Sequence, residues 1–386
     1  MPTIRIRPLG NLGNQMFQFM AAQTIASQVP GSVIANVDIP EWNLHYPDSS
    51  DDPTDRLVFD HRQEVTQVSF VDPDALAAAL NAEAISRVEL SHYCQNTGNL
   101  LPPAGYTAFF PFDGAVGGAG PDELLINIRL GDIANAQHPD YVLLPIAFYR
   151  MLVAVTGLRP VFLGQLDDGA YLAALKAEFP DAVYLPSKGA IADFQFIRNS
   201  CNIVPCISTF SWCAAWLSQA DRIIFPVAGL FHPLQGRHAW LLPLDDARYS
   251  FYVFPIYYSA PQDAALHYHA GLENLWRLVC PGMLEGLRTA PRYKRRKADF
   301  IKLFDAAFYC REYPDVSEIV ASGALKSALT HYVMNGFDEN RRVVDIDPNR
   351  YFQRYVLAAI EVSQGDYTDA QHHYIATGHK RGYHLG

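Results

Sequence analysis

Short apolar runs alternate with stretches of helical spacing over the middle of this chain, and this alternation limits the folds that it can adopt. An apolar run followed by a helix of about ten residues and then by another apolar run is typical of a parallel sheet covered on both faces. The expected strands are 123–129, 160–164, 182–185, 201–204 and 222–225, and the expected helices are 146–155, 170–179, 190–198 and 212–220. The sequence therefore predicts an α/β fold.

A shorter alternation begins the chain. We expect a strand over residues 3–7, a helix over about 15–27 and a second apolar run over 32–37, with a turn of glycine and asparagine before the helix. Residues 39–65 are polar and are expected to form a loop, and a further helix is expected over 74–85. Two α/β blocks predict two Rossmann-like domains that face a cleft, with ligands at the carboxyl ends of the strands.

The boundaries of these blocks follow from composition. Residues 111–121 are rich in glycine and proline and are expected to link the two domains. The chain is accordingly divided into a first Rossmann-like domain over 1–120, a second over 121–245, a helical connecting region over 246–300 and a C-terminal helical module over 301–386. Within the connecting region, residues 262–287 are mostly helical by pattern.

The C-terminal module contains an internal repeat with a period of 42 residues. The matching pairs are Tyr309 and Tyr351, Tyr313 and Tyr355, Gly323 and Gly365, Ala328 and Ala370, His331 and His373, Tyr332 and Tyr374, and Gly336 and Gly378. So many matches in one register argue against chance. Each unit is expected to form two short helices around an apolar seam and to stack on its neighbour.

Composition excludes several classes of protein. The net charge of −10 argues against general binding to nucleic acids, which requires a basic surface. The six cysteines lack Cys-x-x-Cys spacing, which indicates reduced thiols and a cytoplasmic location. No uncharged apolar run reaches the roughly 18 residues of a membrane span, and the histidines show no metal-binding spacing. The basic run 291–297 can touch an anionic membrane surface, although the acidic remainder of the chain favours a solvated linker.

The first candidate site is the turn 10–15, at the expected carboxyl end of the first strand. Its glycines and the start of a helix can bring backbone N–H groups close to a phosphate or a sugar. The relevant residues are Gly13, Asn14 and Gln15. The glycines alone favour an ordinary tight turn between a strand and a helix.

The second candidate site is the end of the strand over 123–129. Arg129 supplies a charged fork that suits a diphosphate, with Asn127 on the same strand. Equally, Arg129 and Asp132 can form an ion pair at the end of the strand that has a structural role and binds no ligand.

Two further segments lie after expected strands. Ser208, Thr209 and Phe210 precede a helix, where hydroxyl and N–H groups can bind an anion or Ser208 can simply cap the helix. Asp193 can accept from a nucleobase edge or belong to the first turn of a helix. The paired carboxylates of Asp167 and Asp168 can hold a metal or a ribose, but Asp168 is rather expected to cap the helix at Ala170.

These segments resemble a known family. Residues 10–18, Gly-Asn-Leu-Gly-Asn-Gln-Met-Phe-Gln, resemble the Gly-Gly-Leu-Gly-Asn-Gln-Met-Phe-Gln opening of bacterial α-1,2-fucosyltransferases. Residues 208–217 are similar to that family's Ser-Ser/Thr-Phe-Ser-Trp-Trp-x-Ala-Trp-Leu segment, and residues 127–133 more weakly to its His-x-Arg-Arg-Gly-Asp-Tyr segment. The resemblance covers about residues 1–245, and the C-terminal repeats resemble modules appended to bacterial glycosyltransferases.

The resemblance implies a GT-B fold, an inverting reaction, GDP-fucose as the donor and a glycan as the acceptor, with no metal or other cofactor. The first domain would then lie on the acceptor side and the second would bind the nucleotide sugar. Arg129 would bind the diphosphate, Ser208, Thr209 and Phe210 would hold the phosphates, Gly13, Asn14 and Gln15 would approach the donor from the other domain, and Asp193 would lie near the guanine or ribose.

Two positions depart from the family pattern. Asn127 stands in place of the family's histidine, and Leu130 in place of its second arginine. Asn127 can still bond a ribose or a phosphate, but it carries no charge. Asp132 is a candidate for the base that deprotonates the acceptor, or it orients Arg129. A different nucleotide sugar, or a weakly catalytic scaffold that binds glycans or proteins, remains an alternative function.

Overall fold

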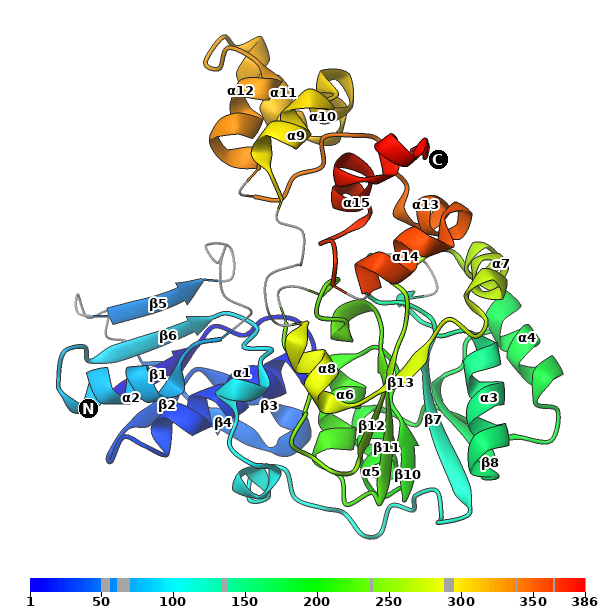
Figure 1. Ribbon diagram of the computed structural model, residues 1–386. Coiled ribbons are helices and arrows are strands. Elements are labelled where there is room, and N and C mark those ends of the chain that lie inside the picture. The colour runs from blue at the N-terminus through cyan, green and yellow to red at the C-terminus, as the bar shows by residue number, and fades with distance from the viewer. Residues whose placement is uncertain are drawn as a thin grey trace.

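The computed structural model describes residues 1–386 except for 50–55, 61–69, 134–135, 137, 237–238, 288–294, 338, 364 and 386. It is a mixed α/β structure built on parallel sheets, as the sequence predicts. Figure 1 shows two sheets with a group of short helices above them at the C-terminal end.

The first sheet has four strands in the order β2-β1-β6-β5, all parallel to their neighbours. The strands are β1 Thr3–Ile6, β2 Val33–Ala35, β5 Arg56–Asp60 and β6 Arg87–Ser91. Beside it, β3 Val37–Ile39 and β4 Leu44–Tyr46 form an antiparallel pair. The helix α2, Pro73–Asn81, agrees with the expected helix, although it ends earlier.

The prediction of a loop over residues 39–65 is wrong where β3, β4 and β5 form, and residues 50–55 and 61–65 lie outside the described part. The strand β6 was not expected because it contains two charged residues, Arg87 and Glu89. Glu89 is nevertheless buried, since Arg7 on the neighbouring segment pairs with it at 2.8 Å.

The second sheet has seven strands in the order β13-β12-β11-β10-β7-β8-β9, and only the β12–β13 pair is antiparallel among those that the structure describes. The strands are β7 Glu123–Arg129, β8 Arg159–Gln165, β9 Val183–Pro186, β10 Asn202–Val204, β11 Arg222–Val227, β12 Tyr249–Val253 and β13 Arg277–Val279. The connecting helices are α3 Ile146–Thr156, α4 Ala170–Glu178, α5 Ala190–Arg198 and α6 Thr209–Trp216. These elements follow the expected order.

The region 262–287 is mostly helical, as predicted, but a short strand interrupts it. It contains α7 Gln262–Leu272, the strand β13 and α8 Pro281–Gly286. Asn274 adopts a left-handed conformation directly after α7, with a φ of 64°, and so turns the chain toward the sheet edge.

The two sheets share one hydrophobic core, which includes Ile4 of the first sheet and Ile126 of the second. The helix α1, Leu12–Ala26, crosses to the second block and packs against α6. The rings of Phe17 and Trp212 lie 4.8 Å apart at this contact. Residues 111–121 have no helix or strand.

A second hydrophobic core fills the C-terminal module, and Leu234 and Ile256 of the α/β part contribute to it. The first unit contains α10 Ala306–Glu312, α11 Pro314–Ala321, α12 Ala328–His331 and a π-helical turn, Tyr332–Gly336. The second contains α13 Pro348–Arg354, α14 Val356–Ser363, α15 Ala370–Ala376 and a 3₁₀ turn, Gly378–Arg381. Figure 1 shows the second unit next to the sheets and the first unit farther out.

Equivalent positions of the two units make the same buried contact. The Tyr309 hydroxyl lies 3.1 Å from His331 Nδ1, and the Tyr351 hydroxyl lies 2.8 Å from His373 Nδ1. A helix before the first unit, α9 Lys297–Lys302, packs against α15 of the second. Residues 291–294 of the basic run lie outside the described part, whereas Lys297 lies 5.0 Å from the Phe337 ring and is not part of a solvated linker.

Candidate functional site

The N-terminal turns of α1 and α6 meet at the boundary between the two sheets. Gly13 belongs to the first turn of α1, and a Cβ atom there would lie 2.7 Å from the Thr209 carbonyl carbon and 2.8 Å from Thr209 Oγ1. Only glycine therefore allows the two helices this approach. Both helices begin three residues earlier than predicted, which places Gly13, Asn14 and Gln15 inside α1 and Thr209 and Phe210 inside α6.

Asn14 connects the two helices through its side chain. Its Oδ1 accepts a hydrogen bond from Thr209 Oγ1 and another from Gln95 Nε2, both at 2.9 Å. Gln15 bonds within its own turn, because its Nε2 donates to the Gly10 carbonyl at 3.1 Å. Gln95 carries no motif around it, so the sequence offered no signal for its part in the site.

The electrostatic character of this meeting point is positive. Neither α1 nor α6 has an acidic residue in its first turn. Asn11 and Ser208 occupy the positions before the helices, and neither side chain makes a capping hydrogen bond. Two helix N-termini that lack a side-chain cap leave backbone N–H groups and two partial positive charges at one place, which favours a bound anion.

Arg129 lies beside these helix ends, at the end of β7. Its Nη1 donates to Ser208 Oγ at 3.2 Å, and its Nε and Nη2 donate to the two carboxylate oxygens of Asp132 at 3.0 and 2.6 Å. The guanidinium carbon lies 5.2 Å from the centre of the Tyr141 ring. These contacts fix the orientation of the guanidinium group and leave one N–H group on each terminal nitrogen for a ligand.

The Arg129–Asp132 pair also bears on the role of Asp132. Both of its oxygens accept from Arg129, and its side chain is 48% exposed. This geometry agrees with an ion pair that orients the arginine. A role as the base would require Asp132 to leave this pairing.

Asn127 is buried behind Arg129 and is used by the fold. Its Nδ2 donates to the Leu163 carbonyl at 2.9 Å, and its Oδ1 accepts from Cys206 Sγ at 3.0 Å. Burial raises the pKa of Cys206 to about 11, so that its thiol stays protonated and remains a donor. Asn127 therefore joins β7 to the neighbouring strand β8 and to the segment after β10.

Asp193 also has partners inside the fold. Its carboxylate accepts from the Ser187 hydroxyl and from the Lys188 backbone N–H, the latter at 2.9 Å. These bonds hold the turn before α5, which agrees with the alternative of a first-turn residue. Phe210 is linked to this helix, because its ring lies edge-on to Phe194 at 5.5 Å.

The prediction that Asp168 caps α4 is wrong. Gly169 occupies the capping position, and Gln262 Oε1 accepts from the Tyr171 backbone N–H at 2.9 Å instead. A residue 91 positions away in the chain thus replaces a local cap. Asp168 is exposed.

The structure brings together most of the expected site residues. Those that meet at the two helix ends are Gly13, Asn14, Arg129, Asp132, Ser208, Thr209 and Phe210. Gln15 lies one position further along α1, whereas Asn127 and Asp193 bond to neighbouring parts of the fold. Tyr141 and Gln95 are additions that the sequence did not indicate.

The described residues contain no group of three or more His, Cys, Asp or Glu side chains suited to a metal ion. Among the described helices, none has the length and apolar character needed to cross a membrane. No protein-family model, curated protein or solved structure matches the chain.

Proposed function

We propose that this protein is an inverting glycosyltransferase that transfers fucose from GDP-fucose to a hydroxyl of a glycan. The observation that supports this most is the meeting of two helix N-termini beside Arg129, at the carboxyl end of a parallel strand. This combination suits a diphosphate. The choice of GDP-fucose as the donor rests on the resemblance of the same segments to fucosyltransferases.

The proposal includes a GT-B arrangement. The first sheet and α1 would form one Rossmann-like domain, and the second sheet would form the other, with the donor at their boundary. The enzyme would work in the cytoplasm without a metal ion, and the C-terminal repeats would serve as an appended module.

In this reaction the bond between the anomeric carbon and the diphosphate oxygen breaks while the acceptor hydroxyl attacks from the opposite face. Negative charge grows on the departing GDP, and the acceptor proton passes to a base. Arg129, the Ser208 hydroxyl and the first-turn N–H groups would stabilise the growing charge, since they are already oriented before the reaction. Asp132 would act as a positioning residue for Arg129.

Binding of GDP to wild type and to Arg129→Ala by titration calorimetry tests the proposal. We expect the dissociation constant to rise at least about tenfold, because hydrogen bonds to a charged group are lost. Arg159→Ala is the control, since Arg159 lies at the opposite end of the neighbouring strand and is 76% exposed. Unchanged GDP affinity in Arg129→Ala, or no transfer from GDP-fucose to any acceptor, contradicts the proposal.

A different nucleotide sugar is the second candidate. It is favoured by Asn127, whose amide is bonded within the fold, and by Leu130, which is buried, so that neither supplies a charge to the donor. Tighter binding of UDP than of GDP would support this candidate. Glycan binding without binding of either nucleotide would instead support the scaffold function.

A further inference from the structure

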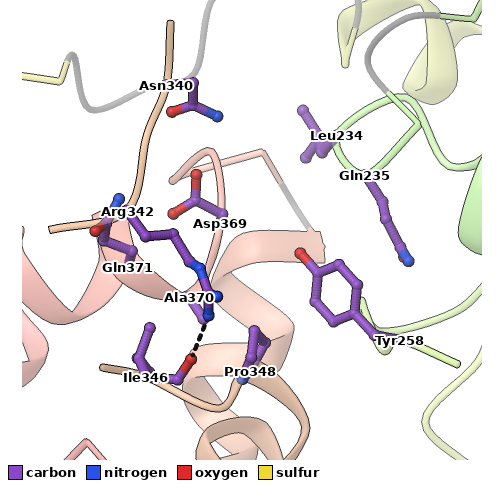
Figure 2. A pocket seen from close by; sticks show the side chains of 10 residues that line it. All are labelled: Leu234, Gln235, Tyr258, Asn340, Arg342, Ile346, Pro348, Asp369, Ala370 and Gln371. Atoms are coloured by element: carbon purple, nitrogen blue, oxygen red, sulfur yellow. Dashed lines mark hydrogen bonds between the residues drawn. The ribbon is translucent and has the colours of Figure 1, made fainter. Parts of the chain in front are cut away.

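A pocket of about 180 Å³ lies where the C-terminal module meets the second sheet. Its walls come from loops after β11 and β12, from the segment between the two repeat units and from the start of α15 (Figure 2). This volume is below the roughly 300–1,000 Å³ of typical small-molecule sites, which limits the ligand to one small unit. The pocket therefore exists only when the module is seated on the α/β part.

The lining combines polar groups of both kinds with apolar surface. Figure 2 shows the Tyr258 hydroxyl and the Asp369 carboxylate on opposite sides of the pocket, with the Asn340 amide on a third side. Arg342 and Asp369 bring one charge of each sign to the lining. Arg342 is held by an ion pair with Glu312 and by a bond to the Ile346 carbonyl at 3.1 Å. The apolar lining consists of Leu234, Ile346, Pro348 and Ala370.

This lining suits a neutral carbohydrate. Sugar hydroxyls both donate and accept hydrogen bonds, and sugar C–H groups pack on apolar side chains. A phosphate or a uronic acid would require an excess of cations, which the lining lacks. The lining therefore favours a neutral ligand over an anionic one.

Gln235, on the wall from the α/β part, has an unpaired acceptor. Its Nε2 donates to the Tyr257 carbonyl at 2.8 Å and to Asp140 Oδ1 at 3.3 Å. Its Oε1 is buried without a hydrogen-bond partner among the described residues, and the residue is 9% exposed. A buried acceptor that lacks a donor is unfavourable, and this one lies beneath the pocket wall, out of contact with a ligand.

The same residue connects the pocket to the candidate site. Gln235 bonds to Asp140, and the next residue, Tyr141, lies against the Arg129 guanidinium. Both sites lie at the carboxyl ends of strands of the second sheet. A short series of contacts therefore joins the pocket to the place where the donor diphosphate would bind.

We propose that this pocket binds a neutral sugar unit of the acceptor glycan, away from the hydroxyl that reacts. The role in acceptor binding rests on the proposed function, whereas sugar binding by the pocket does not. The C-terminal repeats then contribute directly to substrate recognition, because residues 340–348 and α15 form part of the wall.

The test uses the full chain and a panel of immobilised neutral, amino and acidic oligosaccharides. The strongest neutral ligand is then titrated against wild type and against a double variant, Tyr258→Phe with Asn340→Gly. Asn340 has a φ of 57°, so glycine removes its amide without backbone strain. We expect the dissociation constant for the oligosaccharide to rise about tenfold, because two hydrogen-bonding groups are lost.

The matched control is Asn274→Gly, another asparagine with a positive φ (64°) that lies outside the pocket. It should bind the oligosaccharide like wild type. If thermal melting shows that the double variant is unfolded, Tyr258→Phe alone provides the comparison. The proposal is overturned by the absence of neutral-oligosaccharide binding, by a preference for acidic ligands or by unchanged affinity in the variants.

GDP titration of the same samples separates the two proposals. Oligosaccharide binding that depends on Tyr258 and Asn340 in a protein that does not bind GDP supports the pocket and contradicts the proposed donor. GDP binding without oligosaccharide binding supports the donor and overturns the pocket.

Discussion

Thr209 Oγ1 donates a hydrogen bond to Asn14 Oδ1 at 2.9 Å and so joins the first turns of two helices that are 195 positions apart in the chain. Each helix follows a strand of a different sheet, so this bond lies between the two α/β blocks. The positions of the two helix ends, and with them the candidate anion site, depend on how closely α1 and α6 pack.

Replacing Gly13 by alanine tests this packing. The added methyl would overlap the Thr209 backbone, and we expect the free energy of unfolding to fall by about 1–3 kcal/mol. GDP affinity should fall as well, since the helix ends would move apart. Gly271→Ala in α7 is the control, because no atom lies within 4 Å of its added methyl. Equal urea midpoints for Gly13→Ala and wild type would contradict the predicted clash.

Two buried histidines predict a loss of stability in mild acid. Burial lowers the pKa of His232 and of His269 from 6.5 to about 4. The unfolded chain therefore binds more protons than the folded one below pH 6.5, so stability is complete above that pH and decreases toward pH 4. Each histidine should contribute about 3 kcal/mol to this decrease.

Urea unfolding of wild type at several pH values between 7 and 4 measures the decrease. The variants His232→Asn and His269→Gln should each show a weaker dependence on pH. The same dependence in the variants as in wild type would show that other groups cause it.

The buried tyrosine of each repeat unit leaves no room for a side chain on the glycine that faces it. A methyl added at Gly378 would overlap the Tyr351 hydroxyl, and one added at Gly336 would overlap the Tyr309 hydroxyl. Gly378→Ala should therefore destabilise the module by about 1–3 kcal/mol. Adding Tyr351→Phe should recover part of this loss although it removes the bond to His373, so the two changes would be non-additive. Denaturation of the four members of this cycle measures the coupling, and strict additivity would contradict the contact.

Asn349 attaches the second repeat unit to the α/β part. Its Oδ1 accepts from the Tyr258 backbone N–H at 2.7 Å, and its Nδ2 donates to the Tyr258 carbonyl at 3.1 Å. Asn349→Ala removes both bonds, which should cost about 1–3 kcal/mol and increase hydrogen exchange in α13. Asn335→Ala, at an exposed position of the first unit, should leave exchange in α13 unchanged.

Local sequence was sufficient for the α/β fold because strand and helix periodicities recur within a few residues. It was insufficient for β6, where Glu89 is buried because Arg7, just after β1, and Arg56 of β5 pair with it. The capping of α4 by Gln262 could not be predicted for the same reason, because the capping residue belongs to a helix far away in the sequence. Contacts of this kind depend on tertiary structure, and spacing along the chain does not reveal them.

The candidate site shows a similar division. The positions of Arg129 and Ser208 at strand and helix ends could be predicted, because parallel sheets place such residues at one edge. The bonds of Asn127 to Leu163 and Cys206, and those of Asp193 to Ser187 and Lys188, could not, because they depend on the register of three strands and on one turn.

The two repeat units stand in reverse order relative to the α/β part, since the later one is seated on it and the earlier one lies outside. During synthesis the outer unit would emerge from the ribosome before its support exists. The first unit can make its contacts with the second unit only after the second has been synthesised. A premature stop codon just before Asp347 would remove the second unit and leave the first without these contacts.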